Sequence, residues 1–161
     1  KSIFASKIKV SVPAINRLVV WGNHSATQFP DINNVQVDGL DNFDDKYNND
    51  WIVEDFIPRV QNRGAEIIDY RGKSSAASAA SAVYDHLNCI VNGSNDWESM
   101  GILSKNTYNV SPEIFYSFPL SINNKNYKII EDLEMSDLSL RYLKTTEEEL
   151  IHERDIIKDL L

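Results

Sequence analysis

A histidine near the start of the chain lies where a proton-transfer residue could be held. His24 follows Gly22 and Asn23, and the apolar residues 18–21 before them predict a short strand. A glycine-containing turn would leave this strand and hold the histidine at the rim of a sheet. Imidazole titrates near neutral pH, which suits a general acid or base. His24 is therefore the candidate catalytic residue, although a lone histidine is more often structural.

The other metal-binding or nucleophilic residue types indicate no site. His86 and His152 both fall in predicted helices, and the three histidines and the single Cys89 have no metal-ligand spacing. We therefore predict no metal. Cys89 lies in an apolar helical stretch, which favours a buried packing thiol over a nucleophile. A single cysteine excludes an internal disulfide and fits a reducing compartment, so we expect a cytoplasmic protein.

The chain has no nucleotide-binding signature of its own. Its six glycines are scattered, and neither a G-x-G-x-x-G nor a Walker sequence occurs. The serine-rich residues 73–81 lack the G-x-S-x-G turn that exposes a nucleophilic serine, so a serine hydrolase is not indicated.

Composition excludes further classes. A chain of 161 residues with 42% hydrophobic side chains fits one globular domain. The net charge of −8 argues against nucleic acid, whose binders present basic surfaces. No apolar run approaches the eighteen or so residues of a membrane span, so we expect no membrane partner. The acidic residues between positions 38 and 55 are typical of solvated loops.

In the first half of the chain, apolar spacing predicts helices around two short strands. Residues 1–10 form a helix closed by Pro13, and residues 35–37 form an edge strand before a polar surface loop at 39–49. A further helix begins near Asn49 or Asp50, is kinked at Pro58 and ends at Gly64.

The second half predicts a helix, a hairpin and a final helix. Residues 74–91 form a helix dense in Ala and Ser, whose small side chains allow close approach of another backbone. Residues 101–103, 114–120 and 127–130 form strands, with a turn at 122–127. Residues 146–149 read as a capping box opening the last helix, whose apolar stripe reaches Leu161. The predicted fold class is α+β, with antiparallel strands packed with helices.

Several stretches, in order along the chain, closely resemble malate dehydrogenases of the cytosolic type. The most specific one surrounds His24, and the resemblance spans most of the chain, while residues 39–49 match poorly. The matching stretches are Val20-Trp21-Gly22-Asn23-His24-Ser25 with Thr27-Gln28 and Pro30-Asp31, Gln61-Asn62-Arg63-Gly64-Ala65, Ser74-Ser75-Ala76 with Ser78-Ala79-Ala80, Ser99-Met100-Gly101, and Tyr116-Ser117-Phe118-Pro119.

The resemblance implies that residues 1–161 are the C-terminal, substrate-binding half of an NAD-dependent dehydrogenase. The N-terminal Rossmann domain, which binds NAD in this family, would precede the chain. With it would come the family's Asp-x-x-Arg motif and the loop arginines that grip the substrate carboxylates. We therefore expect this half alone to be inactive and to lack NADH affinity. The family also implies a homodimer.

The resemblance also implies residue roles. His24 would take the proton from the 2-hydroxyl of malate and return it to oxaloacetate, oriented by the absent Asp. Ser74 and Ser75 would lie near the substrate and the nicotinamide, and the alternative is that they cap a helix. Two alternatives remain open. The first is a lactate dehydrogenase, because lactate dehydrogenases share the fold and differ in a loop of the N-terminal half. The second is a non-catalytic domain that folds on its own and has no turnover.

Overall fold

The computed structural model of the chain describes residues 1–123 and 125–160 and combines five α-helices in that part with small antiparallel sheets. The helices are α1 (Ser2–Ile8), α2 (Asn49–Trp51), α3 (Ile57–Arg71), α4 (Ala76–Asn92) and α5 (Asp137–Ile157). The strands are β1 (Ile15–Asn16), β2 (Val19–Trp21), β3 (Phe29–Asp31), β4 (Gln36–Val37), β5 (Glu98–Leu103), β6 (Phe115–Asn123) and β7 (Asn126–Ile129). The predicted α+β class with antiparallel strands is confirmed.

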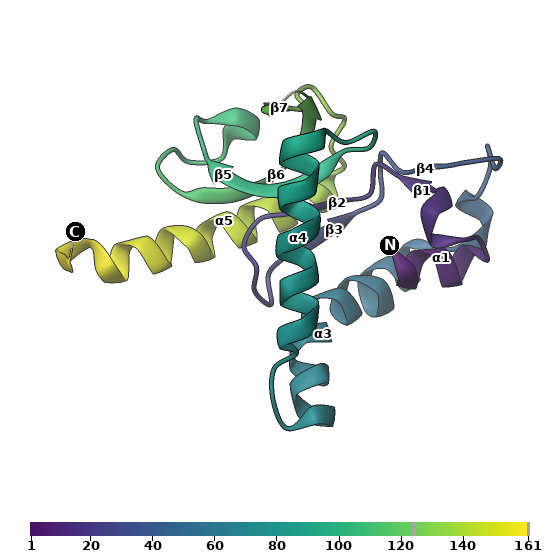
Figure 1. Cartoon of the computed structure of the whole chain (residues 1–161), viewed down its shortest axis with the longest axis horizontal. Coiled ribbons are helices and arrows are strands. Elements are labelled where there is room, and N and C mark those ends of the chain that lie inside the picture. Colours follow the sequence, from purple (N-terminus) through teal and green to yellow (C-terminus); the bar gives the residue numbers. More distant parts are fainter. Residues whose placement is uncertain (124, 161) are drawn as a thin grey trace.

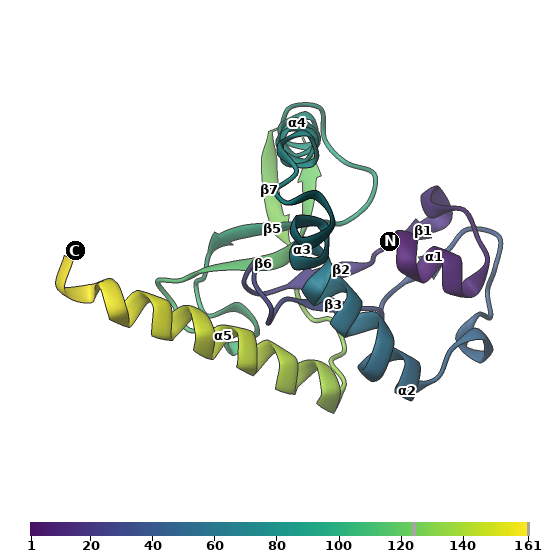
Figure 2. The same cartoon turned by 90° about the horizontal axis from the view of Figure 1, so that it is seen from below.

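The strands pair as β1 with β4, β2 with β3, and β5-β6-β7, every pairing being antiparallel. Met100 lies opposite Phe118 in the β5–β6 pair, and Leu120 lies opposite Ile129 in the β6–β7 pair. Figures 1 and 2 show α4 and α5 on opposite sides of the β5-β6-β7 sheet. The β2–β3 hairpin lies close to this sheet, so the loop that carries His24 runs between the two helices.

The core is built from alternating strand positions and the inner faces of α1 and α5. On β6, Tyr116, Phe118 and Leu120 are buried, and Trp21 of β2 packs edge-to-face on Phe118 at 6.3 Å between ring centres. A second group of aromatic rings gathers around Phe4 of α1. Burying such rings supplies most of the hydrophobic driving force of a small domain.

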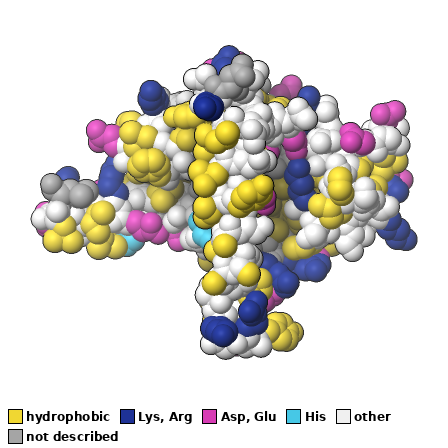
Figure 3. Space-filling view, viewed as in Figure 1, with side chains coloured by type: hydrophobic (Ala, Val, Ile, Leu, Met, Phe, Trp, Pro, Cys, Tyr) yellow, Lys and Arg dark blue, Asp and Glu magenta, His cyan; other side chains and the backbone are white. Residues whose placement is uncertain are grey.

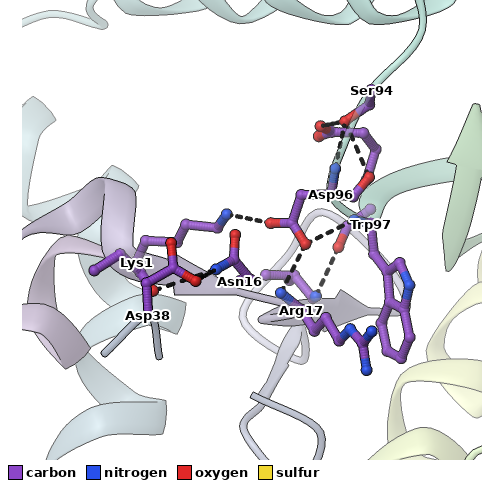
Figure 4. A network of polar contacts seen from close by, with 11 residues as sticks. Lys1, Asn16, Arg17, Asp38, Ser94, Asp96 and Trp97 are labelled. Carbon is purple, nitrogen blue, oxygen red and sulfur yellow. Dashed lines mark hydrogen bonds and ion pairs between the residues drawn. The ribbon is translucent and has the colours of Figure 1, made fainter. Parts of the chain in front are cut away.

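Polar contacts join the N-terminal segment to the segment between α4 and β5 (Figure 4). The Lys1 ammonium lies 2.6 Å from the Asp96 carboxylate, which also accepts the Arg17 backbone N–H at 2.8 Å. The Arg17 guanidinium stacks over Trp97 at 5.0 Å from the ring centre. These contacts fix the chain just before β2, and thereby the strand that leads to His24.

Two predicted helix ends were wrong. The first helix ends at Ile8, and the following Lys9 adopts a left-handed backbone with φ 62, while Pro13 lies in a separate 3-10 turn. The next helix continues through Gly64 to Arg71 and ends at Gly72, whose N–H donates to the Ile68 carbonyl at 2.8 Å. A glycine inside a helix costs only about 1 kcal/mol, and Gly72 provides the left-handed conformation, φ 67, that a helix end favours.

The predicted kink at Pro58 takes the form of a π-helical turn, Ile52–Phe56, just before the proline. A proline lacks an N–H and fits best in the first turn of a helix. Pro58 occupies such a position in α3.

The predicted start of the last helix was also wrong. Helix α5 begins at Asp137, capped by Ser136, whose hydroxyl accepts the Ser139 N–H at 3.1 Å. Residues 146–149 therefore lie inside the helix, and Thr146 and Glu147 are buried. A Thr-x-x-Glu spacing places two side chains on one helix face as readily as it caps a helix.

The predicted strands are present, although β5 begins earlier, at Glu98, and β1 and β3 were not predicted. Asn124 of the predicted turn and Leu161 of the predicted apolar stripe lie outside the described residues.

Cys89 packs against the core but is only partly buried. Within the described part of the chain, no helix is long and apolar enough to cross a membrane. In the same residues, no cluster of three His, Cys, Asp or Glu side chains could hold a metal ion.

Candidate active site

His24 lies in the loop that joins β2 to β3, and Gly22 sets the direction of this loop. Gly22 has φ 88, a conformation that glycine adopts at little cost. Its backbone pairs with Ser117 of β6 through two hydrogen bonds of 3.2 and 3.1 Å. The loop therefore leaves the sheet at a fixed point, two residues before the histidine.

Two serine side chains hold β2 against the larger sheet. The Ser99 hydroxyl of β5 accepts the Val20 N–H at 2.9 Å, and the Ser117 hydroxyl of β6 donates to the Val20 carbonyl at 2.7 Å. Ser99 and Ser117 belong to two of the stretches that carry the family resemblance. Their place in the structure gives these stretches a physical role, because they fix the strand that positions His24.

A cavity of about 480 Å³ opens beside His24. Its wall combines β2, the loop, β5, β6 and α4, and includes Val20, Asn23, His86, Gly101 and Phe115. The walls are mostly apolar, with a few polar groups, which is typical of small-molecule sites.

The His24 side chain is exposed at this cavity. In the described part of the structure, its ring makes no hydrogen bond to another residue. An exposed, unbonded imidazole can accept or donate a proton at a substrate that enters the cavity. The structure thus places His24 beside a cavity at the rim of the sheet, and its catalytic role stays a prediction.

His86 lines the same cavity from α4, a location that the sequence did not indicate. Its Nε2 lies 3.4 Å from the Ser99 carbonyl oxygen, across the cavity wall. Helical spacing alone could not place this residue in the same cavity as His24, because its position there depends on how α4 crosses the sheet.

Ser74 and Ser75 do not line the cavity with His24. They precede α4, and Ser75 caps it by accepting the Ser78 N–H at 3.4 Å. Ser75 lies about 16 Å from His86 along the helix axis, from the rise of 1.5 Å per residue. The alternative role of Ser75 as a helix cap is therefore realised, while a role in substrate binding stays a prediction for both serines.

Helix α4 projects beyond the sheet, and every one of its residues except Cys89 is exposed. Hydrophobic side chains follow its outer face (Figure 3). The exposed large apolar residues of the helix are Val83, Tyr84, Leu87, Ile90 and Val91. A contiguous apolar surface of this kind marks an interaction site.

Comparison with known proteins supplies the context for this geometry. Residues 1–160 match the model of the lactate/malate dehydrogenase α/β C-terminal domain family. A malate dehydrogenase structure from Naegleria fowleri superposes with a TM-score of 0.94 at 38% identity, covering 99% of this chain and 49% of that one.

Two further structures share the fold. The lactate dehydrogenase of Trichomonas vaginalis, solved with NADH and oxamate, gives a TM-score of 0.90 at 26% identity, over 98% of this chain and 50% of that one. The malate dehydrogenase of Plasmodium falciparum gives 0.81 at 22% identity, over 99% and 51%. The chain therefore spans about half the length of these proteins.

Proposed function

Since this chain belongs to the lactate/malate dehydrogenase α/β C-terminal domain family, we propose that it is the substrate-binding half of an NAD-dependent malate dehydrogenase. The family is one of dehydrogenases, which interconvert 2-hydroxy acids and 2-keto acids. The observation that carries the proposal is His24 itself, which is exposed at the mouth of a cavity between β2, β6 and α4 and whose ring makes no hydrogen bond within the described residues.

In this proposal His24 is the acid and base of the reaction. Its neutral imidazole accepts the proton of the 2-hydroxyl group when malate is oxidised, and the imidazolium returns it when oxaloacetate is reduced. NAD, if bound, would supply the hydride acceptor or donor for the substrate carbon that carries this hydroxyl group.

Malate is the first choice of substrate because the N. fowleri malate dehydrogenase is 38% identical to this chain. The T. vaginalis lactate dehydrogenase, at 26% identity and a TM-score of 0.90, supports lactate as the second candidate. The two acids differ by one carboxylate, and the charged group that would recognise it is expected from the N-terminal half.

The residues of this chain do not by themselves fit a whole dinucleotide. The sequence has no glycine-rich phosphate-binding loop, and the cavity beside His24 is lined by apolar and neutral groups apart from its two histidines. We therefore assign NAD binding mainly to an N-terminal Rossmann half, which the twofold length of the relatives supports.

We assign the exposed apolar face of α4 to that nucleotide-binding half. Helix α4 forms one wall of the His24 cavity, so a body that brings a cofactor to this cavity must approach alongside α4. The proposed role of Ser74 and Ser75 near the substrate and the nicotinamide rests on the family resemblance alone, since neither serine lines this cavity. A homodimer and a cytoplasmic location stay predictions from the family resemblance and the single cysteine.

The test begins with the coding sequence upstream of Lys1. We expect it to encode a G-x-G-x-x-G half that ends in an Asp-x-x-Arg motif, and the complete protein to oxidise NADH with oxaloacetate. Pyruvate measured in parallel distinguishes malate from lactate dehydrogenase. A start codon close to Lys1, together with no turnover of either keto acid, would contradict the proposal and favour a stand-alone domain.

A further inference from the structure

We propose that helix α5 is a positioning element for His24: Thr146 and Glu149 hold the loop on both sides of the histidine. The inference rests on the proposed function of His24 in proton transfer. Two segments that are more than one hundred residues apart in sequence, the β2–β3 loop and the middle of α5, are in contact here.

The first part of the contact lies just before the histidine. Thr146 is fully buried, and its hydroxyl accepts the backbone N–H of Asn23 at 2.8 Å. Gly22 packs so closely on Thr146 that a Cβ atom at Gly22 would lie 2.2 Å from Thr146 Cγ2. The threonine therefore fixes the backbone at the two residues that precede His24.

The second part lies just after the histidine. The Glu149 carboxylate accepts short hydrogen bonds from the hydroxyls of both Ser25 and Thr27. It also accepts the Asn23 side-chain amide at 3.1 Å, so one carboxylate ties residues on both sides of His24. Burial alone would raise the pKa of Glu149, but these three donors outweigh it and lower the pKa, which keeps the carboxylate ionised.

The position of the His24 ring depends on these contacts. In the described structure the His24 ring has no hydrogen-bond partner, so its place depends on the backbone that carries it. The hydroxyls of Thr27 and Thr146 lie 2.9 Å apart, which joins the two parts of the contact into one network. Hydrogen bonds to an ionised carboxylate are about twice as strong as neutral ones, so the network suits a positioning role.

Helix α5 is itself firmly anchored next to this network. Leu143 is buried, and the Glu147 carboxylate accepts the Ser111 N–H at 2.7 Å and the Lys144 ammonium at 3.1 Å. The loop is thus attached to a helix that is itself anchored through Leu143 and Glu147, which is what a positioning element requires.

The first experiment measures amide hydrogen exchange in the chain as it is. Thr146→Val keeps the shape of the side chain and removes the acceptor of the Asn23 N–H, so we expect exchange at Asn23 to become at least about tenfold faster. Thr145→Val, one residue earlier on an exposed face, is the matched control. Unchanged exchange at Asn23 would overturn the proposal.

The second experiment measures steady-state kinetics of the complete enzyme. We expect Thr146→Val and Glu149→Gln to lower kcat about tenfold or more while KM changes less than about twofold, because misplacement of a reacting group affects the chemical step. Thr146→Ser, which restores the hydroxyl, should restore kcat. Glu148→Gln on the exposed face of α5 is the control.

Two results separate this inference from the proposed function. A wild-type enzyme without dehydrogenase activity would contradict the proposed function and, with it, the role of α5 in proton transfer. An active wild type whose Glu149→Gln and Thr146→Val variants keep the kcat of the controls would overturn the positioning role alone. Glu149→Gln decides the question even if Thr146→Val fails to fold, because Glu149 is partly exposed.

Discussion

Replacing Gly22 by alanine should destabilise the domain more than the same change at any open glycine. The added Cβ would lie 2.2 Å from Thr146 Cγ2 and 2.3 Å from its hydroxyl oxygen. Carbon atoms in contact are normally about 3.5–4.0 Å apart, so the loop or helix α5 would have to move by roughly 1 Å or more. Overpacking of this kind costs about 1–3 kcal/mol.

A second cost comes from the backbone. Gly22 has φ 88, and an L-residue in a left-handed conformation costs about 1–2 kcal/mol. The two costs together amount to about 2–5 kcal/mol, a large part of the roughly 5–15 kcal/mol that stabilises a typical domain. Gly22→Ala should therefore lower the free energy of unfolding by this amount.

Gly39 provides the matched control, because it has φ 73 but nothing within 4 Å of an added Cβ. Gly39→Ala should cost only the backbone term. Urea unfolding followed by tryptophan fluorescence measures both variants, and Thr146→Ala in the Gly22→Ala background should recover part of the loss. If Gly22→Ala and Gly39→Ala agree within about 0.5 kcal/mol, close packing against Thr146 contributes nothing and the reasoning is wrong.

Three further predictions concern single side chains. His24→Asn should lower turnover of the complete enzyme at least about a hundredfold, as expected for a general acid and base, and unchanged turnover would remove His24 from the mechanism. Burial raises the pKa of Asp31, although the Trp21 indole N–H donates to it, so its contribution to stability is complete below pH 3.8 and declines as the pH rises through the raised pKa. Urea unfolding across this range should therefore show wild type losing stability relative to Asp31→Asn, and a constant difference would contradict the assignment. Burial opposes the ionisation of Glu147, but the Ser111 donors outweigh it and lower its pKa, so its contribution is present above pH 4.5 and is lost as the pH falls through the lowered value. Glu147→Gln should lower the free energy of unfolding by about 1–3 kcal/mol at pH 7 and leave it unchanged at low pH. Thermal melts of both proteins at the two pH values would test this.

The sequence predicted local features of the site well. The apolar run before Gly22 and the turn after it determine the β2–β3 loop, and both are set by neighbouring residues. The antiparallel hairpin of β6 and β7 followed from the same kind of local pattern. Such features are accessible because strands and turns depend on the alternation of residues and on backbone preferences within a few positions.

Helix ends and long-range contacts were harder, and Thr146 shows the reason. Residues 146–149 have the spacing of a capping box, yet the chain has already been helical since Asp137, so the same side chains point from the middle of α5 towards the His24 loop. Helical spacing places Thr146 and Glu149 on one face but does not tell what that face meets. Likewise, Gly64 was predicted to end a helix, yet the helix continues to Arg71 and it is Gly72 that takes the left-handed conformation.

The stretches that carry the family resemblance gain their meaning from where they meet. The Ser99 hydroxyl accepts the N–H of Val20, and the Ser117 hydroxyl donates to the carbonyl of Val20. The Ser117 backbone also pairs with Gly22, and Thr146 binds the loop that follows from the side of α5. Four hydrogen bonds that join Ser99 and Ser117 to Val20 and Gly22 thus fix the start of the loop, while the histidine ring makes no hydrogen bond in the described structure. Rigid support beneath an exposed acid–base group is the arrangement that lets a substrate, rather than the protein, supply the last hydrogen bond. If substitutions in α5 accelerate hydrogen exchange at Asn23 and also lower turnover, the rigidity of this loop contributes to catalysis.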